Sequence, residues 1–70
     1  MMNWSDREDI AEALMEAHPG IDPLAVRFTD LLTWIAELPG FDDDIHLSNE
    51  KKLEAIQMEW YELWQEAGKA

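Results

Sequence analysis

The stretch SNEKKLEAIQMEWYELW, residues 48–64, decides the fold class. Ser48 or Asn49 supplies an N-cap for a helix. Beyond the cap, apolar side chains recur every three or four residues, which is typical of one buried helical face. These side chains are Leu53, Ile56, Trp60, Leu63 and Trp64. The sequence therefore predicts a long amphipathic helix whose apolar stripe needs other surfaces to cover it.

A shorter helix is predicted near the N-terminus. Ser5 stands three residues before Glu8, the spacing of a capping box. The helix ends at His18-Pro19-Gly20, because proline and glycine there interrupt the helical pattern. Its apolar stripe consists of Ile10, Ala13, Leu14 and Ala17. We expect this stripe to pack against that of the long helix.

Two further helices are predicted between these. Asp22-Pro23 combines a capping acid with proline at the first helical position and begins one or two turns, through about Val26. Residues 26–28 are expected to be locally extended or irregular, with an optional short strand near Arg27. Thr29 then caps a third helix that Pro39-Gly40 ends. Its stripe is Leu31, Trp34, Ile35 and Leu38. The prediction is one all-α or nearly all-α domain, residues 1–70, with two short helices arranged as in a helix-turn-helix.

Phe41 is expected to fold back onto the core, and residues 42–47 to form a polar loop. Trp34, Trp60 and Trp64 are predicted to belong to the core, because a stacking platform for nucleic acid needs a basic groove as well. Met58 and Tyr61 lie off the stripe of the last helix and are candidates for partner contacts.

Composition narrows the function. The chain has 70 residues, 16 acidic and five basic, with a net charge of −11 and no cysteine. Nucleic acid and anionic lipid are therefore disfavoured as partners, whereas metal cations and basic protein surfaces are favoured. The acidity serves equally well to keep a small protein in solution. The lack of disulfides, of a signal peptide and of a long apolar run predicts a cytoplasmic protein without membrane contact. The charge favours a monomer.

Two groups of acidic residues stand out. Glu8, Glu12 and Glu16, with Asp9 beside them, fall on the side of the first helix opposite its apolar stripe. Like charges at this spacing repel, and a cation or a basic partner would relieve the repulsion. A solvated face is the commoner explanation for such a pattern.

The second group is Asp42-Asp43-Asp44, followed by Glu50 and Glu54. Carboxylates bind hard divalent cations and also ferrous iron. An EF-hand counted from Asp42 fails, because its glycine position falls on Leu47 and its closing acid position on Leu53. Any metal site here is expected to be open and weak. No nucleophile or acid–base pair is recognisable around His18 or His46, so we predict no enzymatic activity.

From residue 4 to residue 60 the sequence resembles the IscX family. The resemblance is carried by WSD (4–6), Ile10, Ala13-Leu14, Pro19, DP (22–23), VRFTD (26–30), WI (34–35), Leu38, FDDD (41–44), SNEK (48–51), LEAI (53–56) and Trp60. These matches run in one order with unbroken spacing. The resemblance implies a modified winged-helix fold and an accessory role in iron–sulfur cluster assembly.

The resemblance also implies binding to the cysteine desulfurase IscS, weak binding of ferrous iron by surface carboxylates, and competition with the bacterial frataxin homologue. The expected metal ligands are Asp9, Glu12, Glu16, Asp42, Asp43 and Asp44. The expected partner-binding residues are Asp6, Glu8, Asp9, Glu12, Glu16, Glu50 and Glu54. Without cysteine, the chain itself would hold no cluster. The alternative is an acidic domain that mimics DNA and blocks a nucleic-acid-binding protein.

Overall fold

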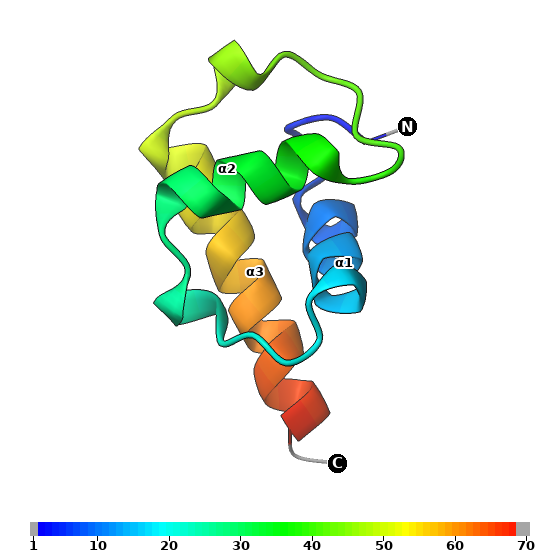
Figure 1. Ribbon diagram of the computed structural model, residues 1–70, viewed down its shortest axis with the longest axis vertical. Coiled ribbons are helices and arrows are strands. Elements are labelled where there is room, and N and C mark those ends of the chain that lie inside the picture. Colours follow the sequence, from blue (N-terminus) through cyan, green and yellow to red (C-terminus); the bar gives the residue numbers. More distant parts are fainter. Residues whose placement is uncertain (1, 69–70) are drawn as a thin grey trace.

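Three α-helices and two 3₁₀ turns follow one another in the computed structural model, which describes residues 2–68 (Figure 1). In chain order they are α1 (Arg7–Ala17), η1 (Pro23–Ala25), α2 (Phe28–Glu37), η2 (Ile45–Leu47) and α3 (Glu50–Gly68). Between residues 2 and 68 the chain forms no strand, only an isolated parallel bridge between Met2 and Phe41. The all-α prediction is confirmed, the optional strand near Arg27 is absent, and the winged-helix detail is not confirmed.

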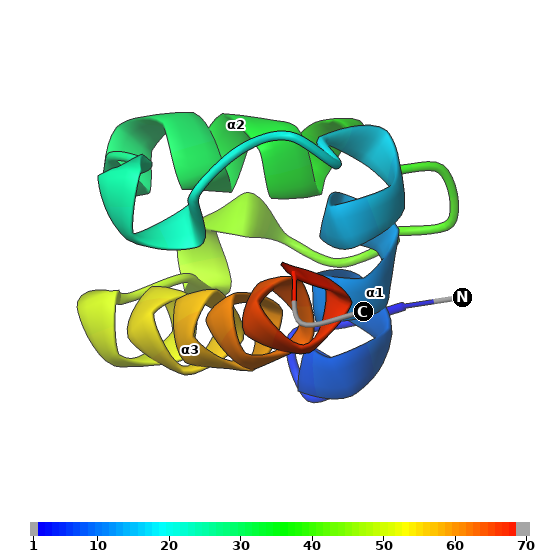
Figure 2. The same ribbon diagram turned by 90° about the horizontal axis from the view of Figure 1, so that it is seen from below.

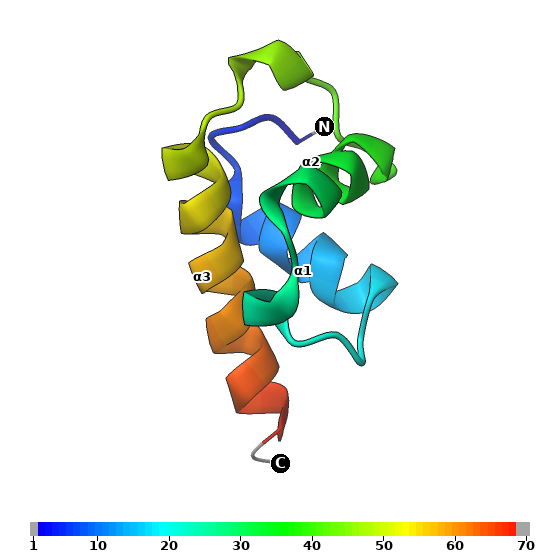
Figure 3. The same ribbon diagram turned by 60° about the vertical axis from the view of Figure 1, so that its left-hand side comes forward.

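The long helix α3 runs along one side of the molecule, and α1, η1 and α2 pack against it (Figure 3). Viewed from below, α2 and α3 form two layers, with α1 crossing at one end (Figure 2). Each helix contributes buried side chains to one core, namely Ile10, Ala11, Leu14, Leu31, Ile35, Leu53, Ile56 and Trp60, together with Trp4 and Leu38. Within residues 2–68 no helix is both long enough and apolar enough to span a bilayer.

The helix α3 follows its predicted stripe as far as Leu63. Trp64, which was predicted to belong to the core, is only half-buried and stacks on Tyr61 instead of packing against the core. Asn49 is the cap, because its Oδ1 accepts a hydrogen bond of 2.8 Å from the backbone N–H of Lys52. Leu53, Ile56 and Trp60 are buried, and the rest of the predicted stripe is half-buried. Burial of Trp60 removes a large aromatic surface from water, which stabilises a small core strongly.

The start of α1 differs from the prediction. The N-cap position is Asp6 rather than Ser5, and no side chain caps the helix. The preceding polar residues bond to each other instead: Asn3 Oδ1 accepts from the Ser5 N–H at 2.8 Å, and Asp6 Oδ2 accepts from the Asn3 N–H at 3.0 Å. The bond to Asn3 takes up the Ser5 N–H, which the predicted capping box would have given to Glu8.

The buried face of α1 is also rotated relative to the prediction. Ala11 is fully buried, whereas Ala13 is half-buried and Ala17 is exposed. Contact with α3 on one side and α2 on the other sets this rotation. A methyl side chain at position 11 allows neighbouring elements to approach closely.

Between α1 and α3, local sequence signals place most of the turns correctly. Asp22 Oδ1 accepts from the Leu24 N–H at 3.0 Å and caps η1, as predicted. The helix α2 begins one residue before Thr29, because the extended Arg27 is its N-cap. It ends before Pro39, and Gly40 follows with a φ of +90°, a conformation that glycine adopts without strain.

Residues 42–47 are more ordered than the predicted polar loop. Asp44 Oδ1 accepts from the His46 N–H at 2.9 Å and caps η2. Phe41 packs against the core as predicted, with its ring 5.1 Å from that of Trp4 in an edge-to-face arrangement. Trp34 is half-buried and stacks on His18 at 4.0 Å between ring centroids. Trp4, only 7% exposed, is a core residue that the helical stripes did not reveal.

Candidate interaction surface

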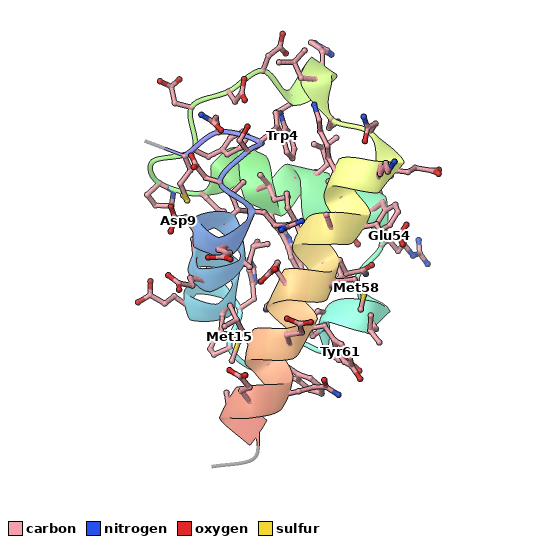
Figure 4. The ribbon with its side chains drawn as sticks, turned by 180° about the vertical axis from the view of Figure 1, so that it is seen from behind. Trp4, Asp9, Met15, Glu54, Met58 and Tyr61 are labelled. Carbon is pink, nitrogen blue, oxygen red and sulfur yellow. The ribbon has the colours of Figure 1, made fainter. Side chains whose placement is uncertain are left out.

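The outer face of α1 carries four exposed carboxylates, which we call the α1 acidic face: Glu8, Asp9, Glu12 and Glu16. Their spacing places them on adjacent turns, opposite the buried Ile10, Ala11 and Leu14. Figure 4 shows Asp9 on the side of α1 that faces away from α3. Near the start of the helix, a shallow hollow of about 230 Å³ is lined by Ser5, Asp6, Arg7, Glu8 and Asp9.

The charges of this face are not neutralised by neighbouring side chains. Among residues 2–68 the single ion pair joins Arg7 Nε to Glu59 Oε1 at 3.6 Å, and it involves none of the four carboxylates. Glu16 stands in the last turn of α1, which contains no basic residue. A carboxylate there interacts unfavourably with the negative end of the helix dipole, whereas Glu8 and Asp9 in the first turn interact favourably with its positive end. The face therefore offers free charge to a partner and costs α1 some stability through mutual repulsion.

The acidic segment at residues 42–44 is arranged differently. Asp43 accepts backbone N–H bonds through both oxygens, from Trp4 at 3.1 Å and from Asp44 at 2.8 Å. The bond from Trp4, then that from Asp44 and the nearby ammonium of Lys52, hold the pKa of Asp43 below its ordinary value of 3.8. The indole N–H of Trp4 also donates to the Asp44 carbonyl at 2.8 Å. These contacts attach the segment to the chain just before α1.

The structure does not gather the predicted metal ligands into a centre. Over the described part of the chain, no three histidine or carboxylate side chains are placed to hold a metal ion. Oxygens of Asp43 and Asp44 are engaged with backbone N–H groups. The α1 acidic face offers pairs of carboxylates on successive turns. Ferrous iron binding by Asp9, Glu12, Glu16, Asp42, Asp43 and Asp44 thus stays a prediction.

The predicted partner-binding residues fall on separate surfaces. Figure 4 shows Glu54 on the opposite side of α3 from Asp9. Glu54 lies instead beside Met58 and Tyr61, of which Met58 is 44% exposed. Asp6 is half-buried, and Glu50 is exposed in the first turn of α3. One small partner surface cannot include both Asp9 and Glu54.

The main feature that the sequence did not reveal is the attachment of residues 42–44 to Trp4. The residues joined by these hydrogen bonds are 39 and 40 positions apart, so no local pattern predicts them. The available signal was a large aromatic residue in a polar stretch, three positions before the first residue of α1. A side chain of that size contributes much to a small core when it is buried.

Comparison with known proteins identifies relatives over nearly the whole chain. The sequence profile of a family described as iron–sulphur cluster assembly matches residues 2–65, which include α1, α2 and most of α3. An uncharacterized protein of Pseudomonas aeruginosa is 49% identical over 61 residues, which cover 87% of this chain and 92% of that protein.

Proposed function

Because the chain belongs to the iron–sulphur cluster assembly family, the family of IscX, we propose that it is a non-catalytic accessory protein that binds a cysteine desulfurase. The observation that carries this proposal is the α1 acidic face, whose four exposed carboxylates have no cationic partner among residues 2–68. A basic patch on the desulfurase is the complementary surface. Such a pairing raises the association rate and sets specificity.

The chemistry of the chain limits its role to binding. It has no cysteine, so it can neither carry persulfide sulfur nor hold a cluster by thiolates. What remains is to carry or sense ferrous iron, or to occupy a surface on the desulfurase. On that surface the chain would compete with the bacterial frataxin homologue for the same basic patch. Regulation of cluster assembly through this competition is the mechanism we propose.

Ferrous iron enters the proposal as cargo. Carboxylates accept this ion, and the α1 acidic face presents them on successive helical turns. Because no three ligands converge in the described residues, binding through this face would be weak and readily reversible. Iron and the desulfurase would then share carboxylates, so each is expected to weaken the binding of the other.

The test is calorimetric titration of the cognate desulfurase under anaerobic conditions. A double variant, Glu12→Lys with Glu16→Lys, reverses charge on the α1 acidic face. Its matched control, Glu62→Lys with Glu66→Lys, makes the same change in net charge at exposed positions of α3. We expect the first variant to bind at least about tenfold more weakly and the control to bind within about threefold of the unchanged protein.

Equal losses in the two variants would show that net charge, and not this face, drives binding. Absence of binding by the unchanged protein at low salt would remove the desulfurase as partner. Displacement of the chain from another protein by DNA would instead support the DNA-mimic alternative. Repeating the titration with ferrous iron present tests whether iron and the desulfurase both bind the α1 acidic face. In that case iron should weaken binding of the desulfurase.

A further inference from the structure

A cleft of about 540 Å³ lies between the N-terminal segment and the start of α3. Figure 3 shows these two parts of the chain side by side. Arg7, Lys51 and Lys52 line the cleft and account for three of the five basic residues. Of the other two, Arg27 is the N-cap of α2 and Lys69 is outside the described residues. The few cations of a strongly acidic chain therefore gather at one place, which we call the basic cleft.

The two lysines of the basic cleft have no carboxylate within 4.0 Å among residues 2–68, since the one ion pair there is between Arg7 and Glu59. Lys52 Nζ donates to the carbonyl oxygen of Leu47 at 2.8 Å, a neutral partner, and the carboxylate of Asp43 compensates part of the Lys52 charge from more than 4.0 Å away. The oxygens of Asp43 accept bonds from the backbone N–H groups of Trp4 and Asp44 and form no ion pair with either lysine. The positive end of the α3 dipole adds to the local potential.

The floor of the basic cleft is apolar. Trp4 and Ile56 are almost completely buried beneath it, and the half-buried Ala55 extends the same surface. Cations above an apolar floor suit a ligand that combines negative charge with hydrocarbon. A small inorganic anion would leave the floor uncovered.

We propose that the basic cleft binds a short acidic segment of a partner protein, with its carboxylates on Arg7, Lys51 and Lys52 and an apolar side chain over Ala55 and the exposed edge of Trp4. Charge complementarity selects this occupant. A nucleic acid or an anionic membrane extends beyond the cleft and would meet the carboxylates that dominate the rest of a surface with a net charge of −11. A short peptide segment covers the cleft alone.

This inference concerns a different surface from the α1 acidic face and does not depend on the proposed function. A chain with both surfaces would hold a basic partner on α1 and an acidic partner at the start of α3. It would then act as a bridge between two proteins.

The test is an NMR titration of the isotope-labelled full chain with the peptide acetyl-Glu-Asp-Leu-Phe-Glu-Asp-amide. Salt is held at about 150 mM, where a Debye length of about 8 Å screens the general repulsion between two acidic molecules. We expect saturable shifts of amide signals around Ser5, Arg7, Lys51 and Ala55. The neutral analogue with Gln and Asn in place of the acids should bind at least about tenfold more weakly.

Two variants of equal net charge locate the site. Lys51→Glu is expected to weaken peptide binding at least about tenfold, and Arg27→Glu less than about twofold, because local charge dominates over distant charge. Both residues are exposed, and a circular dichroism melt confirms that each variant is folded. Equal effects of the two variants, shifts centred elsewhere, or equal binding of the neutral peptide would overturn the proposal. So would concentration-dependent dimerisation that blocks the peptide, because the occupant would then be a second copy.

Discussion

Glu12 and Asp43 are both carboxylates of acidic clusters, but the fold places them in opposite circumstances. Glu12 projects from α1 into solvent among three other free carboxylates. Asp43 accepts two backbone N–H bonds and joins the segment between α2 and α3 to Trp4. A run of acidic residues in a sequence therefore does not reveal which of their carboxylates are available to a partner. Hydrogen bonds to the backbone decide that.

The largest expected effect is that of Trp4→Ala, which removes the attachment of residues 42–44 to the N-terminal segment. This change removes a core side chain that is 7% exposed and the indole N–H bond to Asp44. We expect the free energy of unfolding to fall by about 3–5 kcal/mol, as for other buried aromatic truncations, measured by urea denaturation. The α1 acidic face should still bind the desulfurase at temperatures where the variant is folded. A loss below about 0.5 kcal/mol, typical of surface positions, would contradict the role of Trp4.

A smaller loss is expected from Asp43→Asn, which removes the negative charge of this side chain but keeps its size. The amide oxygen can accept only one of the two backbone bonds equally well and lacks the negative charge that both bonds and Lys52 favour. We expect a lower midpoint of thermal unfolding at pH 7. Asp42→Asn is the matched control, because Asp42 is exposed and its side chain has no hydrogen bond within residues 2–68. Equal effects of the two substitutions would show that only net charge matters.

The lowered pKa of Asp43 gives a pH dependence with a definite sign. Because the folded pKa is below the unfolded value, ionised Asp43 stabilises the folded state fully above its ordinary pKa of 3.8. That contribution is lost as the pH falls from there through the lowered folded pKa. The stability difference between the unchanged protein and Asp43→Asn, measured by urea denaturation from neutral pH downward, should therefore shrink below about pH 4. A difference that stays constant would contradict the assignment.

The smallest expected effect concerns the α1 acidic face. Glu12→Gln removes repulsion with Glu8 and Glu16 on the neighbouring turns of α1. We expect the stability of the protein to rise by a few tenths of a kcal/mol, roughly the size of one such pair, while desulfurase binding weakens. In about 1 M salt, where the Debye length is about 3 Å, the gain in stability should vanish. A gain that survives high salt would have a cause other than charge.

Sequence patterns predicted the elements that depend on neighbouring residues. The stripe of α3 as far as Leu63, the Asn49 cap and the Asp22 cap are all encoded within a few positions, and the structure confirms them. The start of α1 was placed one residue early, because two alternative hydrogen-bonding turns compete around Ser5. Helix content is thus readable from local chemistry, and exact ends are less so.

Features that join distant segments could not be predicted in this way. The exposed positions of the α1 acidic face follow from helical periodicity, so its geometry was expected. The engagement of Asp43 with Trp4 and the convergence of Arg7 with Lys51 depend on tertiary packing. The local sequence around each of these residues does not indicate its distant partner.

The attachment of Trp4 to residues 43 and 44 also bears on the order of folding. It closes a loop of 39 to 40 residues, and closure of a flexible loop of that length costs an entropy equivalent to about 3 kcal/mol. Contacts so distant along the chain form late unless nearby packing has already shortened the path. The contacts between α1 and α3 are comparably distant, but they bury more apolar surface, so the N-terminal segment is expected to lock into place only after α1 and α3 have met. In a growing polypeptide, Trp4 would remain exposed until that late step.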